Sequence, residues 1–151
     1  MAKYICLTSD HCKHTYTNTA SSFTIDIENG ISSILESQYR YEMALSYFSY
    51  DCSFRDNAVD NIFVCSDLCQ KSVLGETKDG VIYYISVSPL NHHRRVVHHI
   101  TPLQYVPIVD SFPTSTTLTV DLLDEDGEHI NLSDNCGPTK CIFVCRKVKQ
   151  A

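Results

Sequence analysis

The fold is decided by residues 38–50, which read QYRYEMALSYFSY. Apolar and polar side chains alternate along this stretch, and a period of two is the pattern of a β-strand with one buried face. One predicted face carries Tyr39, Tyr41, Met43, Leu45 and Tyr47. The other predicted face carries Gln38, Arg40, Glu42, Ala44 and Ser46. A helix would scatter the apolar side chains around its circumference, so the sequence predicts a long strand.

Shorter stretches on both sides show similar strand signals. Candidate strands are 22–27, 61–65, 81–87, 104–109, 116–123, 130–132 and 141–148. Residues 124–129 read DEDGEH and predict a hairpin turn, because an Asp-Gly pair tolerates positive φ; residues 77–80 give a weaker signal of the same kind. Helical turns are expected only at 31–37 and 66–73. Short strands with little helix predict an all-β sandwich or barrel.

The composition supports a globular β protein. The chain has 151 residues, of which 43% are hydrophobic and 20% charged, with nine Tyr, six Phe and no Trp. Tyr and Phe fit the half-buried surfaces of strands. No repeat or linker interrupts the pattern, so we expect one domain over 1–151, with an N-terminal arm or first strand at 1–20, a core at 21–148 and a tail at 149–151.

The net charge of −6 disfavours nucleic acid as a partner, because an acidic surface does not attract phosphates. The basic run Arg146-Lys147-Val148-Lys149 is interpreted as a solvated chain end. No apolar run approaches the length of a membrane helix, and the apolar stretch Tyr4–Leu7 is too short for a signal peptide. We therefore expect no membrane association and no secretion.

The eight cysteines raise the question of a metal site. Their spacings include Cys65-x3-Cys69 and Cys136-x4-Cys141-x3-Cys145, and Cys6, His11, Cys12 and His14 crowd the N-terminus. Structural zinc sites usually contain a Cys-x2-Cys pair, and none is present. Cys141 and Cys145 would point the same way from a strand yet lie roughly 13 Å apart along it. Buried or surface free thiols are the preferred interpretation, with no bound metal.

Residues 92–99 read HHRRVVHH, and their doublets match neither a strand nor a helix. One hypothesis is a pH-sensitive contact surface formed by His92, His93, His98 and His99, which would gain charge near pH 6. The alternative is an exposed loop between strands.

No catalytic motif is evident. A Gly-x-Ser-x-Gly elbow, a P-loop and a dinucleotide fingerprint are all missing, and so is the His-x-His pattern of metal-dependent cupins. We therefore expect no enzymatic activity, no catalytic residues and no cofactor.

Several motifs, taken in order, resemble the minor capsid (penton) protein of Polinton/Maverick elements and adintoviruses, with more distant kin in virophages and adenoviruses. That family shows a hydrophobic strand ending in Asp, a Tyr-x-Pro step, an acidic strand, an Asp-x-x-Gly hairpin and a final strand ending in Arg. The matching stretches, over roughly residues 20–148, are 23–27 with 41–50, 61–68 with 73–75, 103–109, 118–122, 126–127 and 141–147.

The resemblance implies a single jelly-roll β-sandwich of about eight antiparallel strands. It also implies a ring of five at the vertices of an icosahedral shell, beside a major capsid protein with two jelly rolls. The expected location is the virion, after assembly in the host nucleus or cytoplasm. The positions carried over are fold-defining: Gly127 for backbone freedom, Pro107 at a strand edge, Tyr105 as a core anchor, and Arg146 capping or pairing at a strand end.

Two other classes of function remain open at this stage. A jelly-roll recognition module without catalytic activity would share the same strand pattern. A cupin-like metalloenzyme would also share it, although the metal-ligand pattern is missing. Oligomeric mass and metal content separate the three classes.

Overall fold

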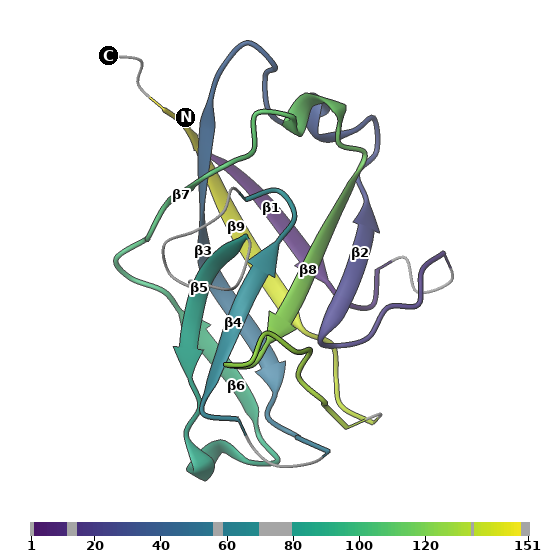
Figure 1. Cartoon of the computed structure of the whole chain (residues 1–151), viewed down its shortest axis with the longest axis vertical. Coiled ribbons are helices and arrows are strands. Elements are labelled where there is room, and N and C mark those ends of the chain that lie inside the picture. The colour runs from purple at the N-terminus through teal and green to yellow at the C-terminus, as the bar shows by residue number, and fades with distance from the viewer. Residues whose placement is uncertain (1, 12–14, 56–58, 70–79, 134, 149–151) are drawn as a thin grey trace.

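The computed structural model describes residues 2–11, 15–55, 59–69, 80–133 and 135–148. Within these ranges the chain forms two antiparallel β-sheets that pack face to face (Figure 1). The helical elements in the same ranges are three short 3-10 turns, η1 (Ile31–Ser33), η2 (Pro89–Asn91) and η3 (Phe112–Thr114). The prediction of an all-β sandwich with little helix is confirmed.

No helix in the described part of the chain has the length and apolar character needed to cross a membrane.

The two sheets divide the strands between them in an interleaved order. Sheet A runs β1 (Lys3–Thr8), β9 (Lys140–Lys147), β3 (Tyr41–Asp51) and β6 (Arg95–His99). Sheet B runs β2 (Ser22–Asp26), β8 (Thr117–Leu123), β4 (Asn61–Ser66) and β5 (Val81–Ser86). The chain therefore crosses between the sheets at most connections, and only β4 and β5 are consecutive neighbours.

A short strand, β7 (Val106–Pro107), continues the edge that β6 begins. β6 pairs with the second half of β3, and β7 pairs with Glu42 and Met43 in its first half. The backbone N–H of Ile100 still donates to Ser46 O, after which the chain leaves β3 until pairing resumes at Val106. β6 and β7 are thus two parts of one strand position, separated by an excursion over residues 101–105.

The core lies between the sheets. Phe23, Phe48, Tyr50 and Phe143 are among its largest fully buried side chains, and aliphatic residues from both inner faces fill the remaining space. Burying each such side chain contributes roughly 1.5–3 kcal/mol, which makes this interior the main source of stability.

The predicted facing of β3 holds only in its first half. Tyr41, Met43 and Leu45 point into the core, but Tyr47 points outward and Phe48 and Tyr50 face inward. The reason is a β-bulge: Leu45 lies opposite Phe143, and Tyr47 lies opposite the next residue of β9, Ile142. Ser46 is the extra residue, and it reverses the alternation. Tyr39 precedes the strand and is exposed, so its predicted place on the buried face is wrong.

Other expectations need correction too. Residues 130–132 form no strand, and only Leu132 among them makes an isolated bridge, to Phe54; the strand predicted at 104–109 is reduced to β7. Residues 95–99, predicted as loop, form β6. Residues 66–69 form a turn, not a helix, whereas the helical turn predicted at 31–37 is present as η1.

Some expectations fall outside the described residues. These are the rest of the helical turn at 70–73, most of the turn at 77–80, the residues Cys12 and His14, and the tail at 149–151.

The bulge leads to a test with two deletions in β3. Deleting Ser46 leaves Leu45 and Phe48 facing inward. We therefore expect a folded protein that loses about 1–2 kcal/mol with the two hydrogen bonds of Ser46, from Ile100 N–H and to Ile142 O. Deleting Ser49 instead turns Tyr50 out of the core and should remove about 3–5 kcal/mol. Urea unfolding measures both, and equal losses would contradict the assignment of Ser46 as the extra residue.

Candidate functional site

The largest of the well-defined hollows in the described structure lies along one side of the sandwich, where β5 ends sheet B and β6 ends sheet A. We call it the edge groove. It has a volume of about 580 Å³ and is lined by residues 83–86 of β5, His98 and His99 of β6, and Ile100, Thr101 and Gln104 of the excursion before β7. Both strands run along the same side of the molecule (Figure 1). The excursion therefore supplies one wall of the edge groove.

His98 lies at the inner side of the edge groove. Its ring stacks on Tyr50, with centroids 6.4 Å apart and planes 6° apart, and on Phe48 at the same separation. Its Nε2 atom is buried and has no hydrogen-bond partner in the part of the chain described. Burial lowers the pKa of His98, because an apolar environment disfavours the charged imidazolium. A buried nitrogen without a hydrogen-bond partner costs free energy in the folded chain.

The four histidines proposed as one contact surface do not come together as one. The rings of His92 and His93 lie 3.8 Å apart with their planes tilted by 44°, in the turn after η2, whereas His98 and His99 point to opposite faces of β6. His99 is exposed and packs edge-on against Tyr47 on the outer face of sheet A. Only His98 and His99 line the edge groove. The sequence does not reveal that His98 and His99 face opposite sides of a strand, because the two neighbouring residues are identical.

Three of the four fold-defining positions meet on the outer face of sheet A. The guanidinium of Arg146 lies 3.5 Å from the centre of the Tyr105 ring, and its Nε donates to Glu42. Pro107 lies opposite Glu42 in the β3–β7 pair. Tyr105 is half-buried and outside the core, so its predicted role as a core anchor is wrong. It instead holds the end of β9 through a cation–π contact.

Gly127, the fourth position, lies far from this cluster, in the turn that follows β8. Its φ of 82° is in the left-handed region, and Gly127 N–H donates to Asp124 O. The carboxylate of Asp124 also accepts from the N–H groups of Asp126 and Glu128. The turn predicted from the Asp-Gly pair is therefore present, closed by Asp124.

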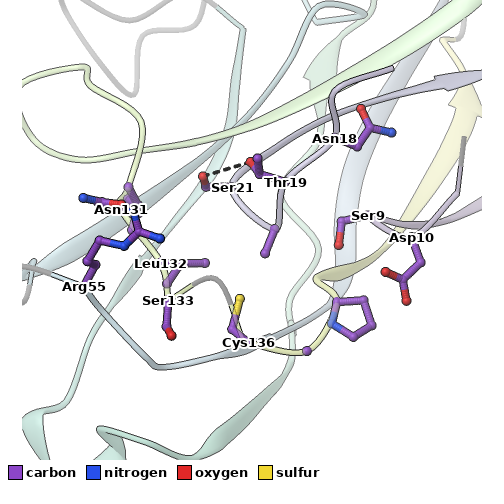
Figure 2. Close-up of a pocket in the computed structure, with 14 residues that line it drawn as sticks. Ser9, Asp10, Asn18, Thr19, Ser21, Arg55, Asn131, Leu132, Ser133 and Cys136 are labelled. Atoms are coloured by element: carbon purple, nitrogen blue, oxygen red, sulfur yellow. Dashed lines mark hydrogen bonds between the residues drawn. The ribbon is translucent and has the colours of Figure 1, made fainter. Parts of the chain in front are cut away.

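A polar hollow of about 340 Å³ opens at one end of the sandwich (Figure 2). Its walls come from segments far apart in sequence: Ser9 and Asp10 after β1, residues 18–21 before β2, Arg55 after β3, and residues 130–133 and 136–138 before β9. Figure 2 shows Arg55 and Asp10 on opposite sides of it.

Buried hydrogen bonds hold these segments in place. The backbone N–H of Thr139 donates to Ser9 Oγ at 3.0 Å, and its hydroxyl donates to Ala20 O at 2.6 Å. Asn18 bonds to the backbone of Thr24 in both directions. The wall thus suits a small polar solute. This hollow could not be predicted from the sequence, because its residues are scattered over 130 positions and form no motif.

Asp121 binds two polar side chains on the outer face of sheet B. Ser22 Oγ donates to Asp121 Oδ1 at 2.7 Å, and His129 Nε2 lies 2.8 Å from the same oxygen. A serine nucleophile needs the histidine beside it as a base. Here the carboxylate lies between the two, so the trio ties β2, β8 and the turn together and does not form a relay.

The described cysteines form no disulfide with one another, and most are packed as apolar residues. Cys52, Cys65, Cys69, Cys141 and Cys145 are buried, and burial raises the pKa of the Cys145 thiol to about 12. Thiols with such high pKa values are poor ligands and nucleophiles at neutral pH. Within the ranges described, no three His, Cys, Asp or Glu residues gather in a way that would hold a metal ion.

No protein-family model matches the chain. A search of curated proteins finds no matching sequence either. The functional proposal therefore depends on the strand order, the surface chemistry and the motifs of this chain.

The burial of His98 predicts an acid-sensitive fold. The unfolded chain takes up a proton on this residue as pH falls below the ordinary histidine value of about 6.5, and the folded chain resists doing so. Between pH 7 and pH 5 the wild type should therefore lose more unfolding free energy than His98→Phe, in which no proton can bind. Urea unfolding at both pH values measures this. Equal losses in the two proteins would contradict a buried neutral His98.

Proposed function

We propose that this chain is a minor capsid protein of the penton type, a single jelly roll that forms a ring of five at the vertices of an icosahedral shell. The order of strand pairing carries the proposal. A jelly roll of eight strands pairs the first with the eighth, the second with the seventh, the third with the sixth and the fourth with the fifth.

Counting β6 and β7 as one interrupted strand, the pairs in this chain follow the same nested order. β1 pairs with β9, β2 pairs with β8, and β4 pairs with β5. β3 pairs with both β6 and β7. An order with so many crossovers between sheets is more specific than the all-β class alone, so it favours the jelly roll over other sandwiches.

The motifs that resemble the penton family also fall where that proposal needs them. The Tyr-x-Pro step, Tyr105 to Pro107, crosses into β7, and the basic end of the last strand, Arg146, contacts Tyr105. The Asp-x-x-Gly motif closes the turn after β8 at Gly127. These motifs thus lie at or beside the ends of β7, β8 and β9.

The outer face of sheet A offers a surface for neighbouring subunits. One row across its four strands contains Cys6, Ile142, Tyr47 and His99, which occupy matching positions in the register. Val97 on the same face is also exposed. A row of apolar and aromatic side chains on a sheet surface is typical of a protein contact.

The partners under this proposal are other copies of the chain and a major capsid protein with two jelly rolls, within the virion. No catalytic activity, cofactor, nucleic acid or membrane is involved.

A recognition module is the second candidate, and the polar hollow favours it. Its hydroxyl, amide and charged side chains suit a small polar ligand. Such a module would function as a monomer, which distinguishes it from the capsid subunit.

The ring is tested by native mass spectrometry and negative-stain microscopy of the purified chain. We expect a species of five subunits that appears as a ring with fivefold symmetry. A protein that stays monomeric at every concentration would contradict the capsid proposal and favour the recognition module.

A further inference from the structure

The end of the sandwich that carries the polar hollow also gathers positive charge. The chain has a net charge of −6 and five arginines, and three of these, Arg55, Arg94 and Arg95, lie at this end. Arg55 lines the polar hollow, whereas Arg94 and Arg95 line a neighbouring cleft. Ser133 and Cys136, which Figure 2 shows on one wall of the hollow, line both. Positive side chains gathered around a cleft raise the local concentration of anions.

We call this neighbouring cleft the arginine cleft. It has a volume of about 210 Å³ and is lined by residues 51 and 53 at the end of β3, residues 93–95 at the start of β6, and residues 133, 135 and 136 before β9. The pairing of Asp51 with Arg95 brings the first two segments together, and the hydrogen bond from Ser133 N–H to Ser53 O adds the third. Pockets for drug-sized molecules have volumes of roughly 300–1,000 Å³, so the arginine cleft suits an ion or a small group.

Four side chains of the arginine cleft have hydrogen-bond donors to spare. Within the described structure, no side-chain hydrogen bond or ion pair engages the guanidinium of Arg94, the hydroxyls of Ser53 and Ser133, or the amide of Asn135. These donors come from all three segments of the wall. The oxygens of an anion only accept hydrogen bonds, so a small anion is the kind of ligand that could use several of these donors at once.

The one carboxylate in the cleft wall is already neutralised. Arg95 Nη1 donates to Asp51 Oδ1 at 3.1 Å, and Arg95 Nη2 donates to Ser49 Oγ at 2.9 Å. The other oxygen of Asp51 accepts from Gly137 N–H. Two positive side chains and one negative side chain leave the cleft with a net charge of +1, with the histidine counted as neutral. Asp51 therefore holds Arg95 in place, and the charge of Arg94 is left for a ligand.

We propose that the arginine cleft binds a phosphate group, carried by inorganic phosphate or by a small phosphate ester. A phosphate directs its oxygens to several sides, so it can accept from donors on all three segments, whereas the two oxygens of a carboxylate lie in one plane. Arginine is also the side chain whose planar fork best matches phosphate. All the groups belong to one copy of the chain, so this inference goes beyond the ring proposed above and does not depend on it.

The site is tested by titrating the chain with inorganic phosphate at constant ionic strength, while backbone amide signals are followed by NMR. We expect saturable shifts at residues 93–95, 133 and 135. Arg94→Gln removes the charge of an exposed side chain and should weaken the affinity by about tenfold or more, because a charge-assisted hydrogen bond is lost.

Arg40→Gln is the matched control. Arg40 is also exposed, and it precedes the first residue of β3, whereas the arginine cleft lies at the other end of this strand. The rise of an extended chain places the two roughly 30 Å apart. The affinity for phosphate should therefore stay unchanged in Arg40→Gln.

A second variant separates hydrogen bonding from charge. Ser53→Ala combined with Ser133→Ala removes two hydroxyls and leaves every charge in place. The backbone bond between these residues is kept, so the fold should persist, and thermal unfolding checks this. We expect phosphate to bind several-fold more weakly to this double variant than to the wild type.

Glycerol 3-phosphate distinguishes the two sources of the phosphate group. Binding of the ester at least as tight as that of the inorganic ion would assign the site to an organic phosphate, and binding of the inorganic ion alone would assign it to free phosphate. Acetate that binds as tightly as phosphate, an absence of saturable shifts, or equal losses in Arg94→Gln and Arg40→Gln would overturn the inference. None of these results bears on the ring, which the mass of the assembly tests separately.

Discussion

The structure depends on β9 being held between the first strand, β1, and the long strand β3. Phe143 at its centre is fully buried and lies opposite both Ile5 and Leu45. This pairing joins residues near the two ends of the described chain, so sheet A depends on contacts between segments far apart in sequence. The same arrangement sets the two edges of each sheet. It thereby places β1 and β6 at the edges of sheet A and β2 and β5 at the edges of sheet B.

The alternation of side chains was enough to predict the class of fold and most of the strands. It failed at two kinds of place. In β3 the pattern continues past Ser46 without a visible break, because Tyr47 and Phe48 are both aromatic and either could face the core. In β6 the doublets of Arg, Val and His hide the period, and the predicted loop is a strand whose inner residues are Val96 and His98. Both errors arise where two adjacent residues have similar side chains but point to opposite faces of the sheet.

The candidate sites were less accessible to sequence reasoning than the fold. The sequence displays the histidine doublets of residues 92–99. The burial of His98, however, depends on Phe48 and Tyr50 from a neighbouring strand. The polar hollow unites segments from four parts of the chain and has no local signature. By contrast, Gly127 and Arg146 were found because a turn and a strand end impose local requirements that the sequence itself displays.

The nested pairing of strands is tested most directly by cross-strand nuclear Overhauser effects to the backbone protons of Phe143. The account predicts contacts to Ile5 on one side and to Leu45 on the other, which place β9 between β1 and β3. Contacts from Phe143 to backbone protons of β8, or to only one neighbouring strand, would contradict it.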